Sequence, residues 1–181
     1  MKKRTSNIHT LCIISLFSAL IVIMAQISFP MPIGVPVTMQ TFAVTIAGII
    51  LGSKKGFLAT LVYVLLGAIG LPVFANFTGG FQAITGPTSG FILSFPMMAY
   101  IIGLSTEHRH RFRFCYSLGI AAGTIFNMLC GILMFCAITH SSLAVGFTAC
   151  GLPFIPVTVI KAIAAAISGI QIRKRCYQFL Q

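Results

Sequence analysis

Acidic residues are almost absent from this sequence, which holds one carboxylate side chain, Glu107, among 181 residues. Charged residues of both signs make up 7% of the chain, against roughly 25% in an ordinary soluble domain. A surface that faces water needs more charge than this, so lipid must be the solvent for most of the chain. A single carboxylate also excludes the paired acids used in general acid–base catalysis.

Two kinds of motif are missing as well. No GxxxxGK[ST] sequence occurs, so the chain cannot hydrolyse ATP by the phosphate-loop route. None of the six cysteines forms a CxxC pair or a zinc-ligand spacing. His108 and His110 have no nearby third ligand, so we expect a solvated loop there. The sequence therefore predicts no catalytic residue, no metal site and no cofactor.

Long uncharged runs are what the sequence does have. Residues 10–53, 56–106, 114–160 and 162–172 contain no Asp, Glu, Lys or Arg, and a bilayer-crossing helix needs about 20 apolar residues. Proline and glycine clusters divide the runs further, because proline lacks the backbone donor that a helix interior needs. We therefore predict an all-α integral membrane protein with a single domain, residues 1–181. Its six spans are expected at about 11–29, 36–52, 56–74, 88–104, 114–138 and 153–172.

Basic residues set the orientation of these spans. Eleven of the twelve lie before span one, between spans two and three, between spans four and five, and after span six. In a six-span arrangement all four groups lie on one side, and positive charge marks the cytoplasmic side. We expect both termini in the cytoplasm of a bacterium and a multi-pass protein of its inner membrane. The groups are residues 2–4, 54–55, 109–113 and 173–175.

Two other interpretations of the basic residues are weaker. In a soluble protein this charge imbalance would suggest nucleic acid, but clusters between apolar runs fit an anionic membrane face better. A basic start followed by an apolar run also fits a cleaved signal peptide. The run from residue 11 to 29 is nevertheless long enough to span, and no clear small-x-small cleavage site follows it.

Lys161 is the one basic residue outside these groups. It lies about eight residues into the predicted last span, roughly 12 Å below its outer edge, where a lysine costs about 2.5–3.5 kcal/mol on insertion scales. Glu107 is expected in a cytoplasmic loop on the opposite face, so it cannot be the partner. One hypothesis is that Lys161 binds the carboxylate of a ligand. The alternative is that it reaches the outer interface or binds carbonyl groups and water.

Neutral polar side chains gather in the second outer loop and at the outer end of span two. Glycines let this loop approach a ligand closely, and amides and hydroxyls suit a neutral polar group such as a urea. A longer loop here can also act as a lid, although an ordinary solvated connector has the same composition. For Asn127 in span five, a bond across helices is favoured over a ligand contact. The candidates are Asn76, Thr78, Gln82 and Thr88 in the loop and Gln40 and Thr41 in the helix.

Four stretches, in the right order, are similar to one known family. VPVTMQT (35–41), AGIILGSKKGFLATLVYVLLGAIGLPVF (47–74) and GPTSGFILSFPMMAYIIG (86–103) resemble the biotin-specific substrate-binding component of energy-coupling factor (ECF) transporters, the BioY family. GLPFIPVTVIKA (151–162) resembles the motif of that family's last helix. The match covers most of residues 11–172.

The resemblance implies a fold and a function. It implies six membrane helices, a biotin pocket that opens to the outside, and no ATPase activity of the chain itself. Energy would come from a separate membrane coupling subunit and two ATPase subunits. It further implies that Lys161 meets the biotin carboxylate, that Thr78 lies near the ureido ring, and that Gln40 and Thr41 belong to the span-two motif.

The sequence departs from the family pattern at three places. Thr158 replaces the acid that usually precedes the lysine by three residues, and Ile92 stands where some members carry arginine. Asn76 and Phe77 replace part of a glycine-rich loop. Another small carboxylate, such as a biotin precursor or a lipoate-like acid, therefore stays an alternative ligand. The sequence also leaves open a membrane-embedded enzyme that uses the two loop histidines, and a structural protein without a ligand.

Overall fold

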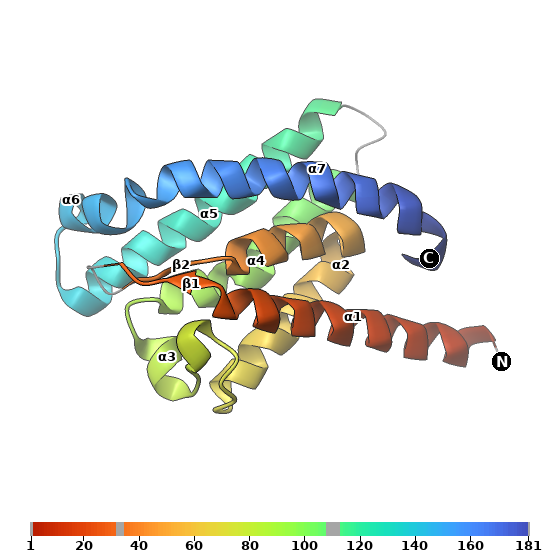
Figure 1. Ribbon diagram of the computed structural model, residues 1–181, viewed down its shortest axis with the longest axis horizontal. Coiled ribbons are helices and arrows are strands. Elements are labelled where there is room, and N and C mark those ends of the chain that lie inside the picture. Colours follow the sequence, from red (N-terminus) through yellow and green to blue (C-terminus); the bar gives the residue numbers. More distant parts are fainter. Residues whose placement is uncertain (1, 32–34, 108–112, 181) are drawn as a thin grey trace.

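Five long helices make up most of the computed structural model, which describes residues 2–31, 35–107 and 113–180 (Figure 1). Within these ranges, five helices are long and apolar enough to cross a membrane. The histidine loop predicted around residues 108 and 110 lies outside the described residues. The five helices are α1 (Lys2–Gln26), α2 (Gln40–Ala68), α4 (Ser89–Glu107), α5 (Arg113–Thr139) and α7 (Phe154–Leu180).

The structure is all-helical as predicted, apart from two very short strands between the first two helices. β1 (Ser28–Phe29) and β2 (Val37–Thr38) form an antiparallel pair of two-residue strands. As a result α1 ends at residue 26 where we predicted 29, and α2 begins at residue 40 where we predicted 36. The strand pair accounts for the difference, because its residues are extended and cannot belong to either helix. Pro30 favours this extended conformation at Phe29, the residue before it.

A glycine breaks α2 in two. Gly52 has φ 82° and ψ −172°, a backbone conformation that is essentially restricted to glycine. A Cβ placed on Gly56 would lie 3.2 Å from the Cα of Gly48, whereas residues eight apart in a straight helix are about 12 Å apart. The two limbs of α2, residues 40–51 and 53–68, therefore double back on each other (Figure 1). The break falls where the sequence predicted a turn between spans two and three.

Small residues bring α4 into direct contact with this break. A Cβ on Gly103 of α4 would overlap the backbone nitrogen of Ser53, and a Cβ on Gly48 would lie 2.8 Å from the carbonyl oxygen of Ala99. Such close backbone approach is typical of membrane helices, where small residues lie at the interfaces. The core thus forms around α2, which also packs against α1 and α7.

Charged side chains from two other helices cap the broken ends of α2. The Glu107 carboxylate accepts hydrogen bonds from the Ser53 backbone N–H, at 2.7 Å, and from the Ser53 hydroxyl, at 2.9 Å. Arg173 of α7 donates to the carbonyl oxygen of Ile49 at 2.6 Å. A negative charge near a helix N-terminus and a positive charge near a helix C-terminus both interact favourably with the helix dipole. The prediction that Glu107 lies in a loop is therefore wrong, because this capping contact extends α4 to Glu107.

The chain termini and the two strands lie at opposite ends of the molecule. The start of α1 and the end of α7 lie at one end, on the right of Figure 1, and β1, β2 and two short helices lie at the other. The predicted loops 75–87 and 139–152 contain short helical turns. They are η1 (Ala75–Phe77), α3 (Phe81–Thr85), α6 (Leu143–Gly146) and the π-helical η3 (Phe147–Gly151).

Cys150 in η3 gives a direct test of how the segment between α5 and α7 packs. Its side chain is fully buried in an apolar cluster that includes Cys136 and Phe135. Burial and, to a smaller extent, the neighbouring Cys136 thiol raise the pKa of the Cys150 thiol to about 11. The thiol therefore stays protonated at neutral pH, and the thiolate is the form that reacts with alkylating reagents.

We expect N-ethylmaleimide at pH 7 to leave Cys150 unmodified in the folded protein, with labelling increasing only as the pH rises towards 11. The same treatment in denaturing detergent should modify it fully. Peptide mass spectrometry measures the modified fraction. Full labelling of the folded protein at pH 7 would contradict the buried position of η3.

Candidate ligand-binding site

A cavity of about 660 Å³ lies at the end of the molecule that carries the two strands. Its volume falls in the range of about 300–1,000 Å³ that is usual for small-molecule sites. The wall comes from β2, the start of α2, residues 70–88, the start of α4, the middle of α5 and the start of α7. All eight candidate residues line it: Gln40, Thr41, Asn76, Thr78, Gln82, Thr88, Thr158 and Lys161.

Lys161 is the one charged side chain among the described residues that line the cavity. It is partly buried, and its ammonium group donates to the carbonyl oxygen of Thr38 at 2.7 Å. A backbone carbonyl, one of the two alternatives drawn from the sequence, is therefore its partner in the ligand-free structure. Glu107 is engaged with Ser53, so it does not neutralise Lys161. Within the described residues the ammonium group therefore has a neutral partner and no carboxylate, and its side chain lines the cavity.

Gln40 and Thr41 enter the wall from the first turn of α2. The Gln40 carboxamide is buried and holds two hydrogen bonds, one from the Thr38 hydroxyl at 2.9 Å and one to the Tyr63 hydroxyl. The Thr41 hydroxyl oxygen is buried without a hydrogen-bond partner. An unpaired buried polar atom costs about 1–3 kcal/mol, so this oxygen, which is closed to solvent, is a local cost to the stability of the fold.

A strained loop forms another part of the cavity wall. Asn76 and Phe77 both have φ of 56°, a left-handed conformation that is uncommon outside glycine. Gln26 at the end of α1 fixes this loop, since its side-chain oxygen accepts from the Phe77 backbone N–H at 3.0 Å and its amide donates to the Phe74 carbonyl at 3.1 Å. Ser28 of β1 donates to the Asn76 side-chain oxygen. The sequence analysis missed Gln26, although an amide at the end of an apolar span was a usable signal.

The other polar loop residues are less strongly held. The Thr78 hydroxyl donates to the Ala75 carbonyl at 2.8 Å, within the same turn, and keeps its acceptor lone pairs. Gln82 in α3 is exposed, and Thr88 lies just before α4 at partial burial. These groups surround the opening of the cavity and offer neutral donors and acceptors.

The deeper wall is apolar and aromatic. Phe91 of α4 and Phe154 of α7 stack with ring centroids 6.1 Å apart and planes 16° from parallel. Asn127 of α5 donates to the Phe91 carbonyl at 2.9 Å and to the Ser94 hydroxyl at 2.7 Å. The favoured interpretation of Asn127 as a bond between helices is thus confirmed. Asn127 also lines the cavity, which its position in the sequence did not reveal.

Comparison with protein families decides the identity of this fold. The model of the BioY family matches residues 1–178, nearly the whole chain. The chain belongs to the BioY family.

Named BioY relatives and a solved structure support the assignment. The biotin transporter BioY of Thermotoga maritima is 40% identical over 162 residues, covering 88% of this chain and 92% of the relative. The probable biotin transporter BioY of Pyrococcus horikoshii is 42% identical over 156 residues, covering 86% and 90%. The crystal structure of the S-component for biotin from an ECF-type ABC transporter superposes with a TM-score of 0.85 at 26% identity, covering 94% and 93%.

The positions at which this BioY protein departs from its family's pattern all lie on the cavity wall. Thr158, in place of an acid, sits one turn before Lys161 on α7, and Ile92, in place of an arginine, is buried at the start of α4. Asn76 and Phe77 form the strained loop. The departures therefore change the lining of the cavity, and Ile92 also belongs to the packed core.

Proposed function

We propose that this BioY protein binds biotin in the cavity beside Lys161 and delivers it across the bacterial inner membrane. It is a transport protein and not an enzyme. Separate ATPase and coupling subunits of an ECF transporter supply the energy. The named relatives and the solved biotin S-component support this function. The single structural observation that carries it is the uncompensated ammonium group of Lys161 on the wall of an otherwise uncharged cavity.

We further propose that the chain crosses the membrane six times, with both termini in the cytoplasm. The break at Gly52 supports this count, because each limb of α2 then serves as one crossing. The first limb is about 18 Å long, and the two strand residues before it, Val37–Thr38, add about 3.3 Å each, which together approach the 30 Å hydrocarbon core. Lys54 is exposed beside the break and Arg173 bonds to Ile49 there. Basic residues therefore gather at the end of the molecule that carries the termini.

The cavity offers each part of biotin a suitable surface. Lys161 pairs with the carboxylate, since a hydrogen bond to a charged group contributes about 1.5–3 kcal/mol. Neutral side chains such as Asn76 and Thr78 match the donors and acceptors of the ureido ring. The stacked rings of Phe91 and Phe154 and the neighbouring methionine side chains pack against the hydrocarbon tail and the thioether ring. No second charge is needed, which fits a ligand of one negative charge.

Equilibrium binding of biotin to the detergent-purified protein tests the function. We expect saturable binding, and saturable biotin uptake by cells that express the chain with its transporter subunits. Absence of binding by a folded preparation would reject the proposal. Competition with a biotin precursor and with lipoate separates biotin from the other carboxylates, an alternative favoured by Thr158 and Ile92 on the cavity wall.

Thr41→Val should make the protein more stable. Valine has the shape of threonine and lacks the hydroxyl whose oxygen is buried without a partner among the described residues. Removing that atom should stabilise the protein by up to about 1 kcal/mol, because a buried polar atom without a hydrogen bond is unfavourable. The melting temperature of the detergent-purified protein measures the effect. A variant that melted below the wild type would show that the hydroxyl makes a stabilising bond.

A further inference from the structure

Tyr63 lies behind the cavity wall and is fully buried in the second limb of α2. It does not line the cavity. Its hydroxyl accepts a hydrogen bond from the side-chain amide of Gln40, which stands on the first limb and does line the cavity. Tyr63 therefore reaches the site through another residue.

The Gln40 amide belongs to a chain of hydrogen bonds that ends at Lys161. The Thr38 hydroxyl donates to the Gln40 side-chain oxygen at 2.9 Å, and the Thr38 carbonyl accepts from the Lys161 ammonium at 2.7 Å. Gln40 and Lys161 are thus bound to the same residue, Thr38, from its two sides. The carboxamide and the ammonium group are therefore linked through one residue, and both side chains belong to residues that line the cavity.

A carboxamide carries two N–H donors and two acceptor lone pairs. In Gln40 one donor is taken by Tyr63 and one lone pair by Thr38. Thr38 and Tyr63 both bind through hydroxyl groups, which can donate or accept, so either orientation of the amide uses one N–H and one lone pair. One N–H remains for the cavity.

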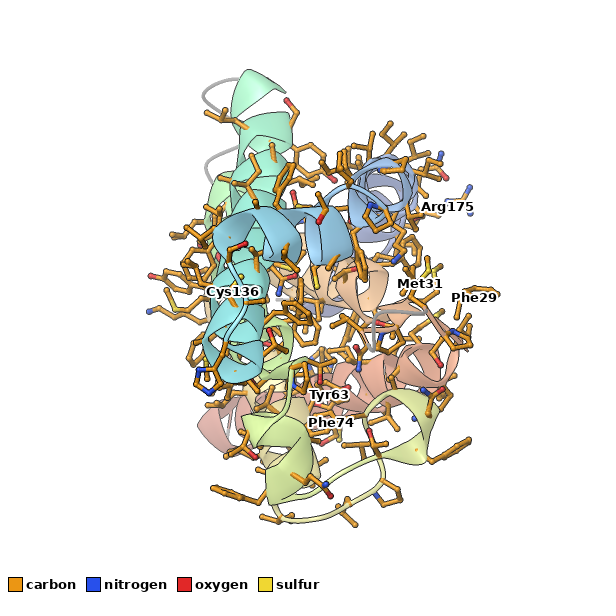
Figure 2. The ribbon with its side chains drawn as sticks, turned by 90° about the vertical axis from the view of Figure 1, so that its left-hand side faces the viewer. Phe29, Met31, Tyr63, Phe74, Cys136 and Arg175 are labelled. Atoms are coloured by element: carbon orange, nitrogen blue, oxygen red, sulfur yellow. The ribbon has the colours of Figure 1, made fainter. Side chains whose placement is uncertain are left out.

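Aromatic packing holds the Tyr63 hydroxyl in place. The Tyr63 ring meets Phe74 edge to face, with centroids 5.5 Å apart and planes at 80°, and the two side chains lie together in Figure 2. The ring of Phe95 lies 6.5 Å from that of Tyr63. Phe74 and Phe95 both line the cavity. A rigid aromatic side chain with a hydrogen-bonding tip is well suited to fix a neighbouring polar group.

We propose that Tyr63 is a positioning residue that aims the free N–H of Gln40 at the ligand's carboxylate, beside Lys161. The anion then meets two donors, one charged and one neutral, which suits its two oxygens. This inference rests on the proposed function, since it assumes that the carboxylate binds at Lys161. It assigns to Tyr63 a part in selecting a carboxylate over a neutral tail.

A double-mutant cycle tests the proposal, with Tyr63→Phe, Gln40→Met and the double variant measured for binding of biotin and of biotin methyl ester. We expect Tyr63→Phe to weaken biotin binding about fivefold, the size of one hydrogen bond, and ester binding less than twofold. In the Gln40→Met background the same substitution should have no further effect, because residues that act through one contact are not additive. Tyr116→Phe is the matched control: the Tyr116 hydroxyl donates to the Ala166 carbonyl at 3.1 Å, away from the cavity, and its loss should leave both affinities unchanged.

Two results would overturn the inference while leaving the proposed function intact. The first is an additive cycle in a protein whose wild type binds biotin. The second is an equal loss of acid and ester binding in Tyr63→Phe, which would mean that Tyr63 acts by packing alone. A folded wild type that binds no biotin would instead reject the proposed function, and this inference with it.

Discussion

Replacing Lys161 by methionine is expected to weaken biotin binding by at least about tenfold, or ~1.5 kcal/mol, the low end for a hydrogen bond to a charged group. Methionine keeps the length and apolar stem of lysine and removes the ammonium group. The remaining wall has no charged side chain among its described residues to replace it. The ligand's carboxylate would then enter a largely apolar cavity without a counter-charge, which is unfavourable.

Two controls separate this effect from damage to the fold. Ile160→Met changes the neighbouring residue, which is exposed on the outer side of α7, and should leave the affinity unchanged. Biotin methyl ester should bind wild type and Lys161→Met alike, because it carries no negative charge. The melting temperature of Lys161→Met should not fall, since removing a partly buried charge relieves a desolvation cost of about the size of the lost bond to Thr38. Identical biotin isotherms for the variant and the wild type would remove Lys161 from the site.

Site residues could be predicted from the sequence where a charged or polar side chain interrupts an apolar, membrane-spanning run. A lysine within an uncharged apolar run is costly in lipid, so Lys161 stands out from its position in the sequence alone. The amides and hydroxyls of the outer loop stand out in the same way, and the cavity collects all of them. The helical runs could be predicted because a membrane restricts the crossing backbone to very few structures.

Residues that act through a neighbour could not be found in this way. Tyr63 breaks no rule of membrane composition, and its role depends on which residue of the other limb it meets. Gln26 supports a loop about 50 residues away in sequence, and only the packed structure brings the two together. The two short strands were missed because two residues are too few to show a period-two pattern.

The charged cap of α2 was missed for a related reason. Lys54 and Lys55 predicted a turn, and the turn is present at Gly52. What the pattern could not predict is that the single acid of the chain, Glu107, would bind the backbone there. A carboxylate that looked like an ordinary loop residue therefore closes the junction between α2 and α4.

Gly52→Ala is expected to destabilise the protein by about 3 kcal/mol, a fall of roughly 10 °C in melting temperature. Two costs add up in this substitution. Alanine at φ 82° and ψ −172° is strained by about 1–3 kcal/mol. Its Cβ would also lie 2.5 Å from the Glu107 carboxylate oxygen, so the carboxylate must move away from Ser53 and the cap, worth about 1–2 kcal/mol, is lost.

Gly70→Ala separates the two costs, because Gly70 also has a positive φ, 105°, but nothing lies within 4 Å of a Cβ there. It should therefore show the backbone strain alone, about half of the Gly52→Ala effect or less. Glu107→Ala removes the cap alone, and adding it to Gly52→Ala should cost little more, since the cap is already lost. Thermal melting of the four variants by circular dichroism measures these differences. Equal melting temperatures for Gly52→Ala and Gly70→Ala would contradict this role of the Glu107 carboxylate at the junction of α2 and α4. So would a double variant whose melting temperature falls by the sum of the two single effects.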